Sequence, residues 1–167
     1  LVNSSFEAFL RIKKIINLKF PQLENNIKFV KGDLRDEKFL NDIFLNEQKK
    51  GKPITGVIHF AGLKSVNESI NKPLKYWDFN LISTINLLKV MNLNGCRTIV
   101  FSSSASVYGS KNETLIYEDQ KLEPINPYGH TKLVIETILR NLFESSSREW
   151  KIINLRYFNP IGAHSSG

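Results

Sequence analysis

The sequence has little cysteine and no long apolar run. Its single cysteine, Cys96, excludes an internal disulfide framework and fits a reducing compartment. The longest apolar runs, such as residues 55–63, contain His or Gly and are far too short to span a bilayer. The first residues also lack the charged and apolar segments of a signal peptide. We therefore expect a cytoplasmic protein without a membrane partner.

Clustered basic charge and metal-ligand spacing are absent too. The net charge is +7, but the longest basic runs are the pairs Lys13-Lys14 and Lys49-Lys50. There is no basic arm and no aromatic RNA-binding signature, so the pattern argues against a nucleic-acid partner. Three separated histidines and one cysteine offer no metal-ligand spacing, and we predict no metal site.

Apolar periodicity predicts helices that alternate with strands. We expect helices over residues 6–20, 36–51, 73–92 and 127–144, and strands over residues 27–31, 56–61, 97–103 and 151–156. Helical crossovers of ten or more residues imply a parallel sheet, and apolar runs imply strands covered on both faces. We see no repeat or linker. The prediction is a single α/β domain over residues 1–167 with a doubly wound parallel sheet.

Ligands of such folds bind at the carboxyl ends of the strands. The expected strand ends select Asp33, residues 61–64, residues 102–104 and the pair Phe158-Asn159 as candidate site residues. Polar residues and glycines also gather there.

Tyr128 and Lys132 form a Tyr-x-x-x-Lys pair at the start of an expected helix. Their spacing places both side chains on one helical face, where an ammonium favours the phenolate and lowers the pKa of the tyrosine. Such a tyrosine can exchange a proton with a substrate hydroxyl. Ser104 lies in a serine cluster where the preceding strand is expected to end, and its hydroxyl can hydrogen-bond the same substrate oxygen. For Ser102 and Ser103, a polar strand end and a functional role remain equally open.

Four extended segments carry a resemblance to a known family. They are VIHFAGLKSVNES (residues 57–69), FSSSASVYG (101–109), PYGHTK (127–132) and LRYFNPIGAHSSG (155–167). In this order and spacing they resemble the NAD-dependent UDP-glucose 4-epimerases of the extended short-chain dehydrogenase/reductase superfamily. The resemblance covers essentially the whole chain and implies an NAD(P)-binding Rossmann-like fold.

The resemblance also implies roles for individual residues. Tyr128 would be the catalytic acid or base on the sugar 4-hydroxyl, Lys132 its partner and a ligand of the nicotinamide ribose, and Ser104 the third catalytic residue. The implied cofactor-binding residues are Leu1, Val2, Asn3, Ser4, Asp33, Leu34, Phe60, Ala61, Gly62, Leu63, Lys64, Asn80, Ser104, Tyr128, Lys132 and Phe158. The implied substrate-binding residues are Lys64, Ser104, Tyr128 and Asn159.

The implied reaction interconverts UDP-galactose and UDP-glucose in galactose metabolism. The 4-hydroxyl is oxidised to a ketone by tightly bound NAD, the intermediate rotates, and hydride returns to its other face. Related sugar-nucleotide 4,6-dehydratases carry an Asp-Glu pair where this chain has Ala105-Ser106. Elimination of water needs that extra acid and base, so the sequence favours epimerisation.

Two parts of the family pattern are missing from the sequence. No glycine-rich phosphate-binding turn occurs, and the sequence stops at Gly167, before the substrate domain that would hold the uridine diphosphate. The sequence also does not begin with Met. We expect an internal fragment that lacks this motif and most of the substrate domain. Its strands would expose apolar edges, and the strand over residues 27–31 would either close a gap or detach. The fragment would have low stability and no epimerase activity, and the whole protein would be a homodimer.

Alternative functions remain open. A UDP-N-acetylglucosamine or UDP-glucuronate 4-epimerase would share these residues, and so would a non-catalytic NAD-binding protein that kept the fold. Nucleic-acid binding by the basic surface is a third alternative.

Further residues are expected to be structural. His59 lies mid-strand and fits a packed core histidine, whereas His130 faces away from Tyr128 and fits a solvated position or a hydrogen-bond partner. Tyr76 and Trp77 would pack on the long helix, which in this family joins a dimer contact. Glu118 and Asp119 fit loop charges.

Overall fold

The fold was examined in a computed structural model, which describes residues 4–110, 115–146 and 149–165. The chain divides into two compact units, residues 1–32 with 161–167, and residues 33–160.

The first unit contains α1 (Phe6–Lys19) and a 3-10 helix, η1 (Pro21–Asn26). Ser5 caps α1, since its side chain accepts a hydrogen bond from the backbone N–H of Glu7 at 3.2 Å. The rings of Phe6, Phe9 and Phe29 pack together with centroids 4.8–5.5 Å apart. The capped helix is the predicted one, but no residue of α1 is fully buried.

The strand expected over residues 27–31 does not form. These residues have no regular secondary structure. A strand needs a neighbour to accept and donate its backbone hydrogen bonds, and no such partner is present among the residues described here. The prediction of a strand there was therefore wrong.

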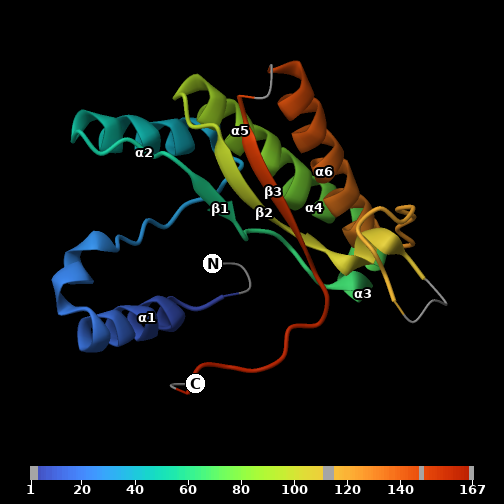
Figure 1. Ribbon diagram of the computed structural model, residues 1–167, viewed down its shortest axis with the longest axis horizontal. Coiled ribbons are helices and arrows are strands. Elements are labelled where there is room, and N and C mark those ends of the chain that lie inside the picture. The colour runs from blue at the N-terminus through green and yellow to red at the C-terminus, as the bar shows by residue number, and fades with distance from the viewer. Residues whose placement is uncertain (1–3, 111–114, 147–148, 166–167) are drawn as a thin grey trace. The chain divides into compact units, whose positions relative to one another are not determined.

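The second unit contains a parallel three-stranded sheet in the order β1-β2-β3 (Figure 1). The strands are β1 (Val57–His59), β2 (Thr98–Ser104) and β3 (Lys151–Tyr157). The helices are α2 (Glu37–Lys49), α3 (Val66–Asn71), α4 (Pro73–Tyr76), α5 (Ser83–Leu93) and α6 (Pro127–Ser145), with a π-helix over Trp77–Ile82 and a 3-10 helix, η3, over Ala105–Tyr108. This is the predicted α/β Rossmann-like fold, with an incomplete sheet.

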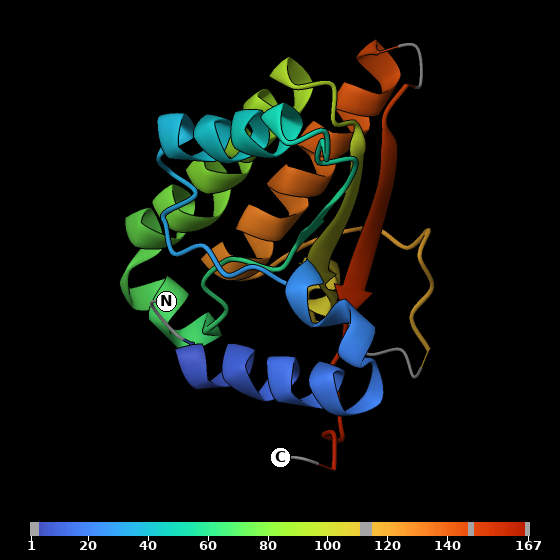
Figure 2. The same cartoon turned by 90° about the vertical axis from the view of Figure 1, so that its left-hand side faces the viewer.

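Helices α2, α5 and α6 cover one face of the sheet. Figure 2 shows α2 (cyan), α5 (green) and α6 (orange) on the same side of β2 and β3. The core beneath them joins Phe44 of α2, Met91 of α5, Leu139 of α6 and Ile99 and Phe101 of β2. Alternate residues of β2 are buried in this core, as expected for a strand with one covered face.

The opposite face of the sheet exposes apolar side chains. The strand register aligns Ile58, Val100 and Ile153 across the three strands. Ile58 is 66% exposed and Ile153 is 55% exposed. The prediction that the strands are covered on both faces was therefore wrong for β1 and β3, because the described helices that pack on this sheet lie on its other face.

Candidate functional site

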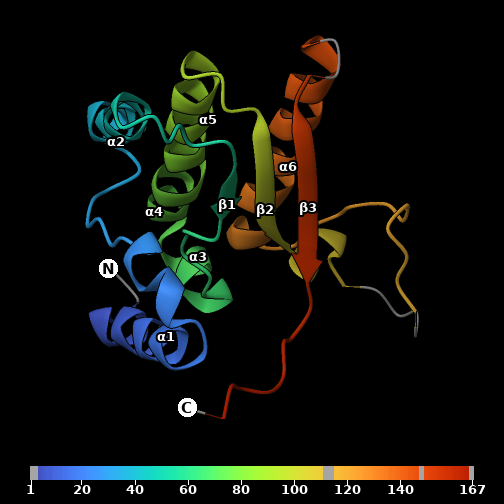
Figure 3. The same cartoon turned by 60° about the vertical axis from the view of Figure 1, so that its left-hand side comes forward.

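The candidate site lies at the carboxyl ends of the three strands. The loop over residues 60–64 follows β1, Ser104 is the last residue of β2, and Phe158 and Asn159 follow β3 (Figure 3). Because the strands are parallel, these segments leave the sheet at the same edge.

Helix α6 presents Tyr128 and Lys132 on its buried face. The side chain of Asn126 caps the helix by accepting the Gly129 N–H at 2.8 Å, and Pro127 fits the first helical position because it lacks an N–H. Tyr128 is 9% exposed and packs with Leu63 and Tyr76. The predicted common face is confirmed.

The ammonium of Lys132 is held inside the site. Its Nζ donates a hydrogen bond to the backbone oxygen of Ser102 at 2.7 Å and lies 5.8 Å from the centre of the Tyr128 ring. It also lies 4.8 Å from the centre of the Phe101 ring, within range of a cation–π attraction. Burial lowers the pKa of Lys132 to about 8, because desolvation disfavours the charged form.

Ser104 stands at the junction between β2 and η3. Its hydroxyl accepts a hydrogen bond from the Ser106 N–H at 3.2 Å and lies 3.1 Å from the Ser106 hydroxyl. Helix α6 approaches this turn closely at Gly129, where an added Cβ would lie 2.8 Å from the Ser106 carbonyl oxygen. A glycine is therefore needed there to bring the start of α6 against the serine turn.

Asn80 ties the loop after β1 to the helices. It lies in the π-helix and is 2% exposed. Its side chain accepts the Leu63 N–H at 2.7 Å and donates to the Leu63 oxygen at 3.0 Å and to the Thr131 hydroxyl at 3.2 Å. π-Helical turns occur often at functional sites. The π-helix over Trp77–Ile82 places the side-chain amide of Asn80 within hydrogen-bond distance of the Leu63 backbone.

Gly62 leaves space beside these groups. An added Cβ would lie 3.1 Å from the Asn80 side-chain oxygen and 3.9 Å from Nζ of Lys132. A loop backbone without a side chain, next to a buried ammonium, suits the close approach of a ligand that bears hydroxyl oxygens. The residues present therefore fit a dinucleotide on this edge of the sheet.

The other predicted site residues occupy varied environments. Phe60 is 61% exposed and Phe158 is 60% exposed. Ala61, Lys64 and Asn159 are exposed as well. Leu34 packs on the core. Asp33 is exposed, and hydrogen bonds from Arg35 hold the pKa of its carboxyl below the ordinary value. Ser4 is exposed in the first unit, and Leu1, Val2 and Asn3 lie outside the described residues. Their proposed roles stay predictions.

His59 is a core residue, as expected. It is 3% exposed, and its Nε2 lies 2.9 Å from the Thr84 hydroxyl, which itself donates to the backbone oxygen of Asn80. Burial lowers the pKa of His59 to about 4, and the nearby Lys132 charge acts in the same direction. His130 is exposed, which confirms its predicted solvated position.

Sequence reasoning missed Glu136 and Arg156. Both oxygens of Glu136 accept hydrogen bonds from Arg156, and Ser103 donates its hydroxyl to the same carboxylate. The sequence left a polar strand end and a functional role open for Ser103, and this hydrogen bond gives Ser103 a structural contact at the strand end. A signal was present, because Glu136 follows Lys132 by four residues on the apolar face of α6, where a carboxylate requires a partner.

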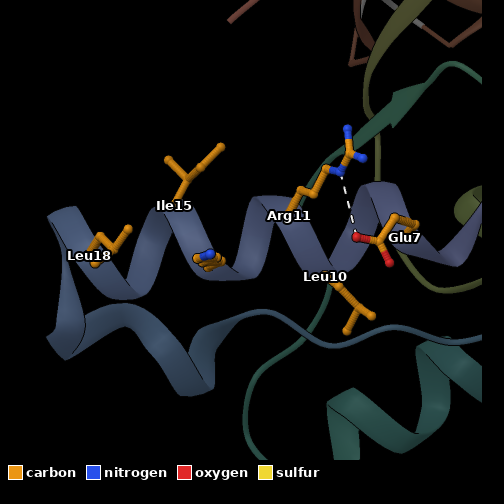
Figure 4. A pocket seen from close by; sticks show the side chains of 6 residues that line it. Glu7, Leu10, Arg11, Ile15 and Leu18 are labelled. Atoms are coloured by element: carbon orange, nitrogen blue, oxygen red, sulfur yellow. Dashed lines mark ion pairs between the residues drawn. The ribbon is translucent and has the colours of Figure 1, made fainter. Parts of the chain in front are cut away.

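A hollow of about 400 Å³ lies elsewhere, on α1. Its lining comes from one face of that helix, including Leu10, Ile15 and the ion pair of Glu7 with Arg11 (Figure 4). The Glu7 carboxylate is paired with Arg11, and the lining contains no Ser, Cys, His or Tyr. The hollow is therefore a surface feature of the first unit.

Comparison with known proteins assigns the family. A family model described as GDP-mannose 4,6 dehydratase matches residues 2–166. The chain belongs to this family. Among the described residues of this family member, no helix has the length and apolar character needed to cross a membrane.

Similar proteins include named epimerases. UDP-glucose 4-epimerase 1 of Oryza sativa subsp. japonica is 50% identical over 167 residues, which are 100% of this chain and 44% of that protein. The UDP-glucose 4-epimerase of Bifidobacterium longum, solved in complex with NAD+ and UDP, is 47% identical with a TM-score of 0.75, over 82% of this chain and 39% of that one. The UDP-Glc/GlcNAc 4-epimerase of Campylobacter jejuni is 32% identical with a TM-score of 0.80, over 95% and 44%. This member of the dehydratase family thus spans less than half the length of its relatives.

Proposed function

We propose that the whole protein, meaning the complete product of the gene that encodes this chain, is an NAD-dependent UDP-glucose 4-epimerase. It would interconvert UDP-galactose and UDP-glucose through a 4-keto intermediate. The observation that carries the proposal is the buried Lys132 ammonium, 2.7 Å from the Ser102 carbonyl and beside the Tyr128 ring, at the strand edge where Ser104 ends β2. A protein that only binds its ligand needs no such proton-transfer set.

In this proposal Tyr128 exchanges a proton with the sugar 4-hydroxyl. The hydroxyl of Ser104 holds the same oxygen, so that the proton moves along a fixed hydrogen bond. The Lys132 ammonium stabilises negative charge on the Tyr128 oxygen and donates to ribose hydroxyls. When bound, NAD supplies the redox chemistry by accepting two electrons from sugar C4 and returning them.

The chain's own residues offer a place for NAD. The backbone after β1, from Phe60 to Lys64, would follow the cofactor, with Gly62 giving room beside Lys132. Phe158 would contact the nicotinamide end, and Asn159 and Lys64 would contact the UDP-sugar. We infer that Asp33, Leu34 and residues 1–4 contact the adenosine end of the cofactor.

Epimerisation is favoured over dehydration, although the family model carries the dehydratase description. A dehydratase needs an acid and a base near sugar C5 and C6. After Ser104 this chain has Ala105 and Ser106, and the Ser106 hydroxyl lies 3.1 Å from Ser104. No carboxylate stands at these two positions.

UDP-N-acetylglucosamine is a second candidate substrate, since one similar structure is a UDP-Glc/GlcNAc 4-epimerase. UDP-glucuronate epimerisation and NAD binding without catalysis are further alternatives. We further propose that residues 1–167 are part of the NAD-binding domain, that the whole protein is a cytoplasmic homodimer of galactose metabolism, and that it binds neither nucleic acid nor membrane. Cytoplasmic location is supported by the single cysteine.

Product analysis tests the proposal. The whole protein is incubated separately with UDP-galactose, UDP-N-acetylgalactosamine and UDP-galacturonate, and the products are resolved by chromatography. We expect conversion of UDP-galactose to UDP-glucose. Conversion of only another sugar nucleotide would move the substrate and keep the mechanism. Retention of NAD without any conversion would favour the non-catalytic alternative.

A further inference from the structure

Glu136 is a buried carboxylate one helical turn beyond Lys132 on α6. It is 6% exposed, and a charge in such a place is costly unless it is paired and hydrogen-bonded. Arg156 pairs with it in a bidentate manner, Nε to Oε1 at 3.1 Å and Nη2 to Oε2 at 2.8 Å. The Ser103 hydroxyl donates to Oε1 as well. Every bond of this carboxylate therefore points toward the sheet.

Arg156 connects the carboxylate to further segments. Its Nη1 donates to the Tyr108 hydroxyl at 2.8 Å and to the Glu118 backbone oxygen at 2.9 Å. The guanidinium carbon also lies 5.0 Å from the centre of the Tyr108 ring. Hydrogen bonds to Glu136 raise the pKa of Arg156, so this residue remains a cation. One ion pair thus joins α6, β3, η3 and the loop that precedes α6.

The end of β2 is attached to α6 twice in succession. The Ser102 oxygen accepts from Lys132, and the Ser103 hydroxyl donates to Glu136. Ser104 is the next residue, so these two bonds hold the strand end that carries it against α6. An apolar pair could fill the same space without desolvating two charges, but it would not set the register of strand against helix through directional bonds.

We propose that Glu136, oriented by Arg156, is a positioning residue that holds Ser104 in register with Tyr128 and Lys132. It acts through Ser103 and touches neither substrate nor cofactor. This inference rests on the proposed epimerase function for its kinetic consequence, whereas the attachment itself concerns only residues of this chain.

The kinetic test uses four variants of the whole, NAD-loaded protein. Glu136→Gln keeps the shape of the side chain and removes its charge, and Ser103→Ala removes one hydroxyl while leaving the ion pair. The third variant combines both. Glu149→Gln is the matched control. Glu149 forms an ion pair with Arg97 just before the first residues of β3 and β2, at the end of the sheet away from the site, and both side chains are exposed there. Activity is expressed per bound NAD.

We expect Glu136→Gln to lower kcat by about tenfold to a hundredfold, as a misplacement of reacting groups does, with KM unchanged. Ser103→Ala should lower kcat less. The double variant should be no slower than Glu136→Gln, because both changes weaken the same connection from Arg156 through residue 136 to Ser103. A double variant slowed by the product of the single effects would overturn the inference. So would a Glu136→Gln protein with a lower melting temperature but normal kcat per bound NAD.

Backbone hydrogen exchange tests the attachment without any activity. In Glu136→Gln we expect faster exchange over residues 102–108, and in Glu149→Gln no change there. Equal exchange in both variants would overturn the inference. If the parent protein converts no UDP-sugar, the proposed function fails, while exchange still decides whether Glu136 holds this segment.

Discussion

The ammonium of Lys132 and the backbone oxygen of Ser102 lie 2.7 Å apart, which attaches helix α6 to the end of β2. The bond uses one of the three donors of the ammonium. Tyr128, one turn earlier on the same buried face, packs against Leu63 of the loop after β1. Tyr128 and Lys132, the pair predicted from the sequence, therefore lie where α6 contacts the end of β2 and the loop after β1.

Removal of the Lys132 amine should change how stability depends on pH. Burial lowers the pKa of Lys132 from 10.5 to about 8, so between these values the unfolded chain binds a proton that the folded chain does not. The free energy of unfolding therefore rises by about 3 kcal/mol as the pH increases from 8 to 10.5. Below pH 8 the destabilisation from burying the charged amine is fully present. Lys132→Met should abolish the rise in denaturant titrations. The exposed Lys89→Met serves as control, and a rise that survives in Lys132→Met would refute this cause.

His59 should produce a second pH dependence on the acid side. Its pKa is lowered from 6.5 to about 4, so the folded chain resists protonation while the unfolded chain accepts it. Stability attributable to His59 should fall by roughly 3 kcal/mol as the pH drops from 6.5 to 4. His59→Gln should remove this part of the acid sensitivity, whereas His130→Gln, at an exposed position, should leave it. Identical acid titrations for the two variants would contradict the assignment.

Asn80→Ala should loosen the loop after β1. The substitution leaves the buried N–H and carbonyl of Leu63 without their partners, which costs about 2 to 3 kcal/mol of unfolding free energy. It should also weaken NAD retention, measured as bound NAD after gel filtration. Asn94→Ala removes a similar side chain from the far end of α5, where it bonds Asn41 and Val90. Equal NAD loss in the two variants would argue against a role for Asn80 in the site.

The 167-residue chain alone should be weakly stable and inactive. Ile58 and Ile153 present apolar side chains on the uncovered face of the sheet, and such surfaces promote association. We expect a broad, low-temperature unfolding transition and no turnover of UDP-galactose by the purified chain. A sharp cooperative transition together with measurable turnover would show this expectation to be wrong.

Much of the fold could be predicted because local signals and tertiary structure agree. The capping residues Ser5 and Asp36 and the helix-starting Pro127 are sequence signals that stand at real helix starts, and the strand preceding the serine cluster ends at Ser104. Pattern alone failed for residues 27–31, since an apolar run becomes a strand only when another strand pairs with it. Local apolar character likewise could not reveal which face of β1 the helices cover.

The site was predictable to the extent that single residues carry its chemistry. Tyr128 and Lys132 share a face because helix geometry requires it. The bonds around Glu136 could not be predicted, because its partners Ser103 and Arg156, and Tyr108 as a further partner of Arg156, come from separate segments that meet only in the folded chain. The same holds for Asn80, whose amide reaches Leu63 through a π-helical turn that no sequence period indicates.

The most direct test of the central claim compares UDP-galactose conversion by the whole protein and by its Tyr128→Phe variant. Tyr117→Phe, at a position 58% exposed in a loop, controls for loss of a phenolic hydroxyl. We predict UDP-glucose formation by the wild type and by Tyr117→Phe. Tyr128→Phe should retain NAD but lose activity by on the order of a hundredfold or more, the contribution expected of a general acid–base. Wild-type-like conversion by Tyr128→Phe, or none by the wild type with NAD bound, would contradict the account.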